Sequence, residues 1–189
     1  MTKPKIQYRR DLWRLFTHIP IDQLGGAAEV GVAEGNFSED MLSWSIKFPF
    51  VHMVDRWRHI PNAKGDSNKP QEWHDNNYGK AVARTAKFGA RASVLKCESA
   101  EAASLVGDRH MSLVYIDADH SYFGVRADIR VWYPKLKAGG VMAFHDYENS
   151  AYGVKKAVEE FCHHRNIEIF LLPEDKEEDA GAYFYVDTV

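Results

Sequence analysis

Short apolar runs alternate with amphipathic stretches from about residue 27 to the end of the chain. The apolar runs predict strands at Ala27–Val32, Phe50–Asp55, Ala92–Lys96, Met111–Asp117, Gly140–His145, Ile167–Leu172 and Ala182–Val186. Several runs are apolar almost throughout, which is typical of strands covered by helices on both faces of a sheet. The alternation therefore predicts an α/β fold: a Rossmann-like, doubly wound sheet, seven-stranded and mostly parallel, with helices on both faces.

The amphipathic stretches have helical spacing. Apolar side chains recur on one face between Tyr122 and Leu136, and again between Val154 and Phe161. We expect Gly139-Gly140 to end the first of these helices and to lead into the next strand. A helix near Arg10–Ile19 precedes the sheet, and an acidic turn over Pro173–Gly181 predicts that the last strand enters antiparallel at the sheet edge.

Residues 56–77 interrupt the alternation of predicted strands and helices. This segment contains two prolines and two tryptophans, and its apolar residues show no clear period. A long segment of this kind inside a compact domain is typical of a lid or binding loop. The length of 189 residues suits one domain, which we take as residues 1–189 with an N-terminal helical segment at 1–24 and a lid-like insertion at 56–77.

Charge and composition restrict the function. The formal net charge of -3 leaves no basic excess for a nucleic-acid partner, and we expect Tyr8, Arg9 and Arg10 to form a solvated helix face. No apolar run approaches the roughly 20 residues that cross a bilayer. The start of the chain lacks an apolar signal stretch, and two cysteines make no disulfide framework. We expect a cytoplasmic protein that acts on a small molecule without membrane or nucleic acid; exposed aromatic residues near both termini are compatible with a homodimer.

The first predicted strand continues into a glycine-containing turn with the spacing Glu-x-Gly-x-x-x-Gly, formed by Glu29, Gly31 and Gly35. Glycines allow a sharp turn and close approach of the backbone to a ligand, and the following helix presents free N–H groups. The spacing differs from the Gly-x-Gly-x-x-Gly of dinucleotide-binding proteins. Without a ligand, the same residues could simply form a strand-to-helix turn.

Acidic residues follow the second and third predicted strands. Asp55 stands about 20 residues after the last glycine, where a carboxylate accepts hydrogen bonds from ribose hydroxyls in several cofactor classes, NAD included. Glu98 and Ser99 follow the third strand and are placed to bind an adenine. The alternatives are a helix cap or surface carboxylate for Asp55, and a helix N-cap for Ser99.

The fourth and fifth predicted strands end in ionisable residues. Asp117 and His120 follow the fourth strand, and His145 and Asp146 follow the fifth. Because the carboxyl ends of adjacent parallel strands meet in one crevice, we expect these side chains to converge. Gathered carboxylates repel one another unless a cation joins them, so a divalent metal is the expected partner. Asp119 and Ser121 are expected to cap a helix instead, and a turn is the alternative for Asp146.

The ordered motifs Glu-x-Gly-x-x-x-Gly, Val-Asp-Arg-Trp, Tyr-Ile-Asp-Ala-Asp-His-Ser-Tyr, Lys-Ala-Gly-Gly and His-Asp-Tyr resemble those of class I S-adenosylmethionine-dependent methyltransferases. Within that class the chain is most similar to the macrocin O-methyltransferase-type branch (methyltransferase type 24) and, more distantly, to caffeoyl-CoA and catechol O-methyltransferases. The resemblance extends over roughly residues 25–187. It implies a cofactor-binding set of Glu29, Gly31, Gly35, Asp55, Trp57, Glu98, Ser99 and Asp117.

The resemblance also implies a metal site and a base. Asp117 and Asp146 match positions that hold magnesium in the metal-dependent branch, and His145 completes the set here. The branch typically carries Asp-Asn at the end of the fifth strand, whereas imidazole suits zinc, iron or manganese better than magnesium. His120 stands where the caffeoyl-CoA type has a lysine base, and an ordinary histidine pKa near 6.5 suits proton removal at neutral pH.

These inferences predict transfer of a methyl group from S-adenosyl-L-methionine to a hydroxyl of a small organic molecule, with Mg or Mn as the divalent metal. His120 or His145 acts as the base, with Asp117 as the third catalytic residue. Two alternatives remain open at this point. One is an NAD-dependent oxidoreductase on a Rossmann fold, and the other is an inactive methyltransferase-like binding subunit. The sequence does not name the methyl acceptor.

Overall fold

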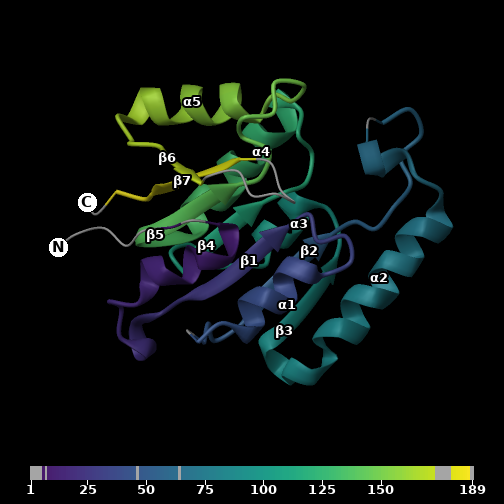
Figure 1. Ribbon diagram of the computed structural model, residues 1–189, viewed down its shortest axis with the longest axis horizontal. Coiled ribbons are helices and arrows are strands. Elements are labelled where there is room, and N and C mark those ends of the chain that lie inside the picture. Colours follow the sequence, from purple (N-terminus) through teal and green to yellow (C-terminus); the bar gives the residue numbers. More distant parts are fainter. Residues whose placement is uncertain (1–5, 7, 46, 64, 173–179, 188–189) are drawn as a thin grey trace.

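The computed structural model describes residues 6, 8–45, 47–63, 65–172 and 180–187. They form a seven-stranded sheet with the order β3-β2-β1-β4-β5-β7-β6 (Figure 1). The strands are β1 (Gly26–Val30), β2 (Val51–Asp55), β3 (Ala92–Lys96), β4 (Met111–Ile116), β5 (Leu136–Phe144), β6 (Phe170–Leu172) and β7 (Gly181–Tyr185). Strands β1 to β5 pair in parallel, and β7 pairs antiparallel with both β5 and β6.

The predicted Rossmann-like α/β fold is therefore confirmed, antiparallel last strand included. One detail differs: β7 lies between β5 and β6, so the strand at this sheet edge is β6 rather than the last strand. Most of the predicted connection Pro173–Gly181 lies outside the described residues.

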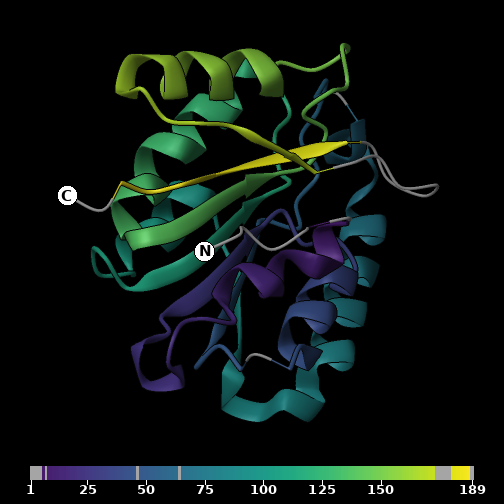
Figure 2. The ribbon, with the colours of Figure 1, turned by 60° about the vertical axis from the view of Figure 1, so that its left-hand side comes forward.

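Helices cover both faces of the sheet (Figures 1 and 2). They are α1 (Asn36–Ser43), α2 (Gln71–Thr85), α3 (Ser99–Ser104), α4 (Tyr122–Trp132) and α5 (Val154–Arg165). An N-terminal 3-10 helix, Arg9–Phe16, lies with α1 and α2 on one face, and α3, α4 and α5 lie on the other. Among the described residues, no helix is both long and apolar enough to cross a membrane.

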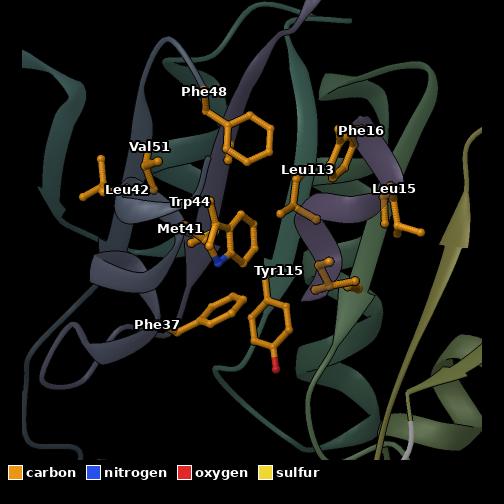
Figure 3. Packing of buried hydrophobic residues seen from close by; sticks show 14 of the residues in the cluster. Leu15, Phe16, Phe37, Met41, Leu42, Trp44, Phe48, Val51, Leu113 and Tyr115 are labelled. Carbon is orange, nitrogen blue, oxygen red and sulfur yellow. The ribbon is translucent and has the colours of Figure 1, made fainter. Parts of the chain in front are cut away.

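Two hydrophobic clusters, one on each face, hold the layers together. Alternate residues of a strand point to opposite faces, so Leu113 and Tyr115 of β4 belong to one cluster, and Val114 and Ile116 to the other. On the face of the N-terminal helix, the ring of Phe37 packs 4.4 Å from that of Tyr115 (Figure 3). The core thus fixes the carboxyl ends of the central strands in a rigid frame.

Three local predictions need correction. The first helix is a 3-10 helix that ends at Phe16, short of the predicted Ile19. Gly139-Gly140 does not end a helix but lies inside β5, where the pairing with β4 shifts register and Gly139 adopts a φ of 73°. Residues 71–77 of the segment predicted to be a lid form the first turns of α2. The amphipathic stripe of α2 is weak, which explains why its period was not visible in the sequence.

Candidate active site

The glycine turn lies at the carboxyl end of β1, beside the end of β4. Gly31 has a φ of 93°, and a Cβ at this position would lie 2.0 Å from the backbone oxygen of Asp117. The turn and the end of β4 are thus in van der Waals contact, which only glycine permits. Gly35, with a φ of 79°, immediately precedes α1. The predicted strand-turn-helix context of both glycines is present.

Asp55, at the end of β2, fixes this turn. Its Oδ2 accepts hydrogen bonds from the backbone N–H groups of Val32 (2.9 Å) and Ala33 (3.0 Å), and its Oδ1 accepts one from the N–H of Trp57 (2.8 Å). The indole Nε1 of Trp57 donates to the carbonyl of Ala33 at 2.9 Å. Trp57 is only 1% exposed, so its side chain is buried where it hydrogen-bonds to the turn. Contacts of Asp55 and Trp57 with the cofactor stay predictions.

Glu29 is buried inside β1, where it accepts a hydrogen bond from the hydroxyl of Ser38 in α1. Burial raises the pKa of Glu29 to about 8, although the bond from Ser38 opposes the rise. At neutral pH this carboxyl group is therefore mostly neutral. The predicted contact of Glu29 with the methionine part of the cofactor stays a prediction.

Glu98 and Ser99 have separate roles at the end of β3. Glu98 is half-exposed and forms ion pairs with Arg58 (2.6 Å) and Arg56 (3.7 Å). The Ser99 hydroxyl points inward, where it donates to Asp128 of α4 and accepts a hydrogen bond from the indole of Trp132 at 2.9 Å. The alternative interpretation of Ser99 as a helix N-cap is wrong by one residue. Ser99 is the first residue of α3, the N-cap is Glu98, and the Glu98 side chain makes no capping hydrogen bond.

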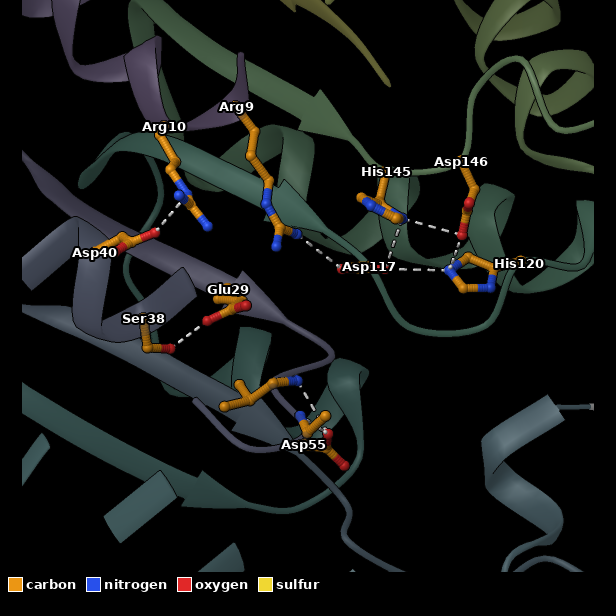
Figure 4. Close-up of polar contacts among 12 residues, drawn as sticks. Arg9, Arg10, Glu29, Ser38, Asp40, Asp55, Asp117, His120, His145 and Asp146 are labelled. Atoms are coloured by element: carbon orange, nitrogen blue, oxygen red, sulfur yellow. Dashed lines mark hydrogen bonds and ion pairs between the residues drawn. The ribbon is translucent and has the colours of Figure 1, made fainter. Parts of the chain in front are cut away.

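Asp117, His120, His145 and Asp146 converge as predicted (Figure 4). Nε2 of His120 lies 3.2 Å from Oδ1 of Asp117 and 3.2 Å from Oδ2 of Asp146. Nδ1 of His145 lies 3.5 Å from Oδ1 of Asp117 and 3.0 Å from Oδ2 of Asp146. One ligand atom from each side chain lies within 4.8 Å of all the others. We call these four residues the Asp-His cluster.

The electrostatics of the Asp-His cluster reflect two carboxylates facing two imidazoles. Burial lowers the pKa of His120, but the hydrogen bond and charge of Asp117 and the charge of Asp146 outweigh burial and raise it. Burial also lowers the pKa of His145, and the neighbouring carboxylates of Asp146 and Asp117 outweigh burial and raise it. Nδ1 of His145 is buried, and its contact with Oδ2 of Asp146 at 3.0 Å is an ion pair.

Local backbone contacts orient this cluster. The backbone N–H groups of Asp117 and His145 donate to the neighbouring strands at Val30 (2.7 Å) and Ile116 (3.0 Å). The carbonyl of His120 accepts from Gly153 at 2.8 Å. Asp146 has a φ of 53°, so it both begins a turn and joins the cluster.

Of the two helix caps predicted beside the cluster, Ser121 is confirmed, whereas Asp119 bonds to the cap residue and not to the helix. The Ser121 side chain caps α4 by accepting from the N–H of Gly124 at 3.1 Å. Asp119 in turn accepts from the N–H of Ser121 at 2.8 Å. These two polar residues therefore stabilise the loop that carries His120, and they lie outside the Asp-His cluster.

Two residues of this region, Arg9 and Asp128, have roles that the sequence pattern did not predict. Arg9 was expected on a solvated face, but its side chain is 18% exposed and its Nη1 lies 3.7 Å from Oδ2 of Asp117. The expectation holds for Arg10, which is 62% exposed. Asp128, in the middle of α4, is buried, and burial raises its pKa to about 6. A charged residue on the apolar stripe of an amphipathic helix was the available signal for Asp128.

Comparison with known proteins agrees with this geometry. The methyltransferase domain family matches residues 28–147, from β1 through the Asp-His cluster. A protein of Sinorhizobium fredii, the uncharacterized protein y4gI, is 30% identical over 76 residues, which are 40% of this chain and 8% of that protein. The chain therefore belongs to the methyltransferase domain family.

Solved structures share the fold at low sequence identity. The calicheamicin methyltransferase CalS11 superposes with a TM-score of 0.65 at 17% identity, over 92% of this chain and 75% of that one. The O-methyltransferase NovP superposes with a TM-score of 0.63 at 18% identity, over 86% of this chain and 72% of that one. An O-methyltransferase from Bacillus cereus, solved in complex with SAH, superposes with a TM-score of 0.64 at 13% identity, over 92% of this chain and 79% of that one. The predicted class, S-adenosylmethionine-dependent methyltransferases, is confirmed in family and fold.

Proposed function

We propose that the protein transfers the methyl group of S-adenosylmethionine to a hydroxyl of a small organic molecule, and that a divalent metal at Asp117, His145 and Asp146 assists the reaction. The observation that carries this proposal is the Asp-His cluster, whose four ligand atoms lie within 4.8 Å of one another. The cluster occupies the carboxyl ends of β4 and β5, beside the glycine turn of β1. Ligands of open α/β sheets bind at this edge.

The described residues fit the cofactor. Gly31 and Gly35 open the backbone at the end of β1, and Asp55 ends the neighbouring β2. A carboxylate has about four acceptor positions, and Asp55 uses three of them for backbone N–H groups, so one is left for a ribose hydroxyl. S-adenosylmethionine supplies the electrophilic methyl group. The protein has to hold the acceptor oxygen in line with it, and such positioning contributes much of the rate in two-substrate reactions.

The metal also fits, on the chemistry of the donor set. Two carboxylates and a buried imidazole nitrogen without a hydrogen-bond partner face one another at Asp117, Asp146 and His145. Oxygen ligands suit magnesium and manganese, and the imidazole favours manganese, iron or zinc over magnesium. When bound, the ion would lower the pKa of the acceptor hydroxyl.

His120 is the residue that we assign as the base. Its Nε2 lies 3.2 Å from both cluster carboxylates, and in the neutral tautomer that carries its hydrogen on Nδ1 this nitrogen would take the hydroxyl proton. These carboxylates stabilise the imidazolium that forms, as the raised pKa of His120 indicates. Tyr152 stacks on the ring with centroids 4.6 Å apart, which keeps the imidazole in one orientation. His145 is then left for the metal.

Metal titration by calorimetry, with Mn²⁺ and separately Mg²⁺, tests the metal part of the proposal. We expect the wild-type protein to bind Mn²⁺ more tightly than Mg²⁺, and Asp146→Asn to weaken Mn²⁺ binding at least about tenfold, since it removes one anionic ligand. Asp119→Asn is the matched control, because Asp119 lies on the same loop as His120 but outside the cluster. Full metal binding by both Asp117→Ala and Asp146→Ala would contradict the proposal.

The acceptor chemistry has its own test. Purified protein with S-adenosylmethionine and Mn²⁺ should release S-adenosylhomocysteine with a hydroxyl acceptor from a panel of phenols and sugars. His120→Gln should lower the rate of that reaction roughly 100-fold or more, the scale of general-base catalysis. Turnover with amine or thiol analogues, and none with the hydroxyl acceptors, would contradict O-methylation and indicate methyl transfer to nitrogen or sulfur.

A further inference from the structure

Arg9 brings a positive charge from the N-terminal 3-10 helix to Asp117 at the end of β4 (Figure 4). Its side chain is 18% exposed, and its guanidinium lies over the ring of Phe37, 4.9 Å from the centroid. Nη1 lies 3.7 Å from Oδ2 of Asp117. Arg10, the next residue, points instead to the exposed Asp40 on α1 at 3.2 Å. The two adjacent arginines therefore have different environments: of the two, Arg9 reaches Asp117 and Arg10 reaches Asp40.

The order of the strands fixes the direction in which the cofactor would lie. β2 and β4 flank β1 on opposite sides. If Asp55 on β2 binds the ribose, as proposed above, the amino acid group would lie on the other side of β1, toward Gly31 and the end of β4. That end is where Arg9 meets Asp117.

Arg9 places a cation beside the end of β4. The amino acid group of the cofactor carries a carboxylate, and a carboxylate next to that of Asp117 would be repelled by it. A guanidinium at the same place offsets that repulsion. The planar fork of an arginine matches a carboxylate in a bidentate way. At 3.7 Å the contact of Arg9 with Asp117 is an ion pair beyond hydrogen-bond distance.

We propose that Arg9 binds the carboxylate of the cofactor's amino acid group, so that the N-terminal segment completes the cofactor site. This inference rests on the proposed function. It assigns a binding role to a segment that lies outside the region matched by the methyltransferase domain family, residues 28–147. Recognition of the two ends of the cofactor is then divided between β2 and the N-terminal helix.

A pair of ligands separates the two ends. S-adenosylhomocysteine carries the amino acid group, and 5′-methylthioadenosine has the same adenosine and thioether sulfur without it. We expect Arg9→Met to weaken binding of S-adenosylhomocysteine about 10- to 100-fold in calorimetry, the scale of a charge-assisted hydrogen bond. Binding of 5′-methylthioadenosine should stay within about twofold, and Arg9→Lys should lose less for S-adenosylhomocysteine than Arg9→Met, since it keeps the charge without the fork.

Arg10→Met is the matched control, since it removes the neighbouring guanidinium and should leave both affinities unchanged. Thermal unfolding of each variant checks that the fold is intact. Equal losses for the two ligands in Arg9→Met would assign Arg9 a structural role and overturn the inference, as would no loss for either. A wild-type protein that binds neither ligand would reject the proposed function itself, and this inference with it.

Discussion

The hydroxyl of Ser38 donates a hydrogen bond to Oε2 of Glu29, and this pair joins α1 to β1 beneath the glycine turn. Glu29 is 2% exposed, so its carboxyl group has little access to water that could stabilise a negative charge. The pair sits on the same side of the sheet as Arg9, whose positive charge lowers the pKa of Glu29 only in part. A group that is neutral at pH 7 therefore supports a site crowded with charges.

Glu29 should make the stability of the protein fall as the pH rises. Its pKa is raised from 4.5 to about 8 in the folded state, so between these values the folded state binds more protons than the unfolded state. By linkage the free energy of unfolding falls across that window, by at most about 5 kcal/mol from this group. Glu29→Gln removes the titration, and its stability relative to wild type should rise from pH 5 to pH 9 in urea unfolding. An unchanged difference between the two proteins across this range would contradict the assignment.

Gly31→Ala should destabilise the fold by about 3 kcal/mol or more. An added Cβ would lie 2.0 Å from the backbone oxygen of Asp117 at a φ of 93°, so both the clash and the backbone strain oppose the substitution. Gly79→Ala is the control: it lies in α2, and no heavy atom comes within 4 Å of the added Cβ. That variant should gain roughly 0.5–1 kcal/mol, as Ala exceeds Gly inside a helix. Similar denaturation midpoints for both variants would show that the turn does not contact β4.

Ser99→Ala should cost about 1–3 kcal/mol of stability, because it leaves two buried partners unsatisfied. The Ser99 hydroxyl donates to Asp128 and accepts from Nε1 of Trp132. Loss of that bond should also raise the pKa of Asp128 above about 6, since the bond lowers it. Ser104→Ala, at the exposed end of the same helix, should change the unfolding free energy by less than about 0.5 kcal/mol. Equal effects of the two substitutions in chemical denaturation would exclude the buried network.

The sequence predicted the sheet well because its signal is local. Apolar runs and the turns between them identify β3 at its observed bounds and the other strands within a few residues. The convergence of Asp117, His120, His145 and Asp146 also followed from the rule that neighbouring parallel strands share an edge. The sequence did not predict that β7 lies between β5 and β6, because an antiparallel strand can occupy either an edge or an inner position of the sheet.

Long-range contacts explain the remaining differences. Arg9 and Arg10 have the same local sequence context, and only the packing of the 3-10 helix on the sheet directs one of them toward Asp117. Asp55 matched the ribose position by its spacing, whereas its three backbone hydrogen bonds to the glycine turn and Trp57 depend on the loop conformation. A single sequence carries no pattern for contacts of that kind.

The most direct test of the central claim is calorimetric titration of the wild-type protein with S-adenosylhomocysteine and, separately, with NAD, each with and without Mn²⁺. We expect S-adenosylhomocysteine to bind and NAD not to bind, and we expect Mn²⁺ to give a separate heat that is lost in Asp117→Ala. Binding of NAD in place of S-adenosylhomocysteine, or of neither ligand, would contradict the assignment of a methyltransferase cofactor site to this edge of the sheet.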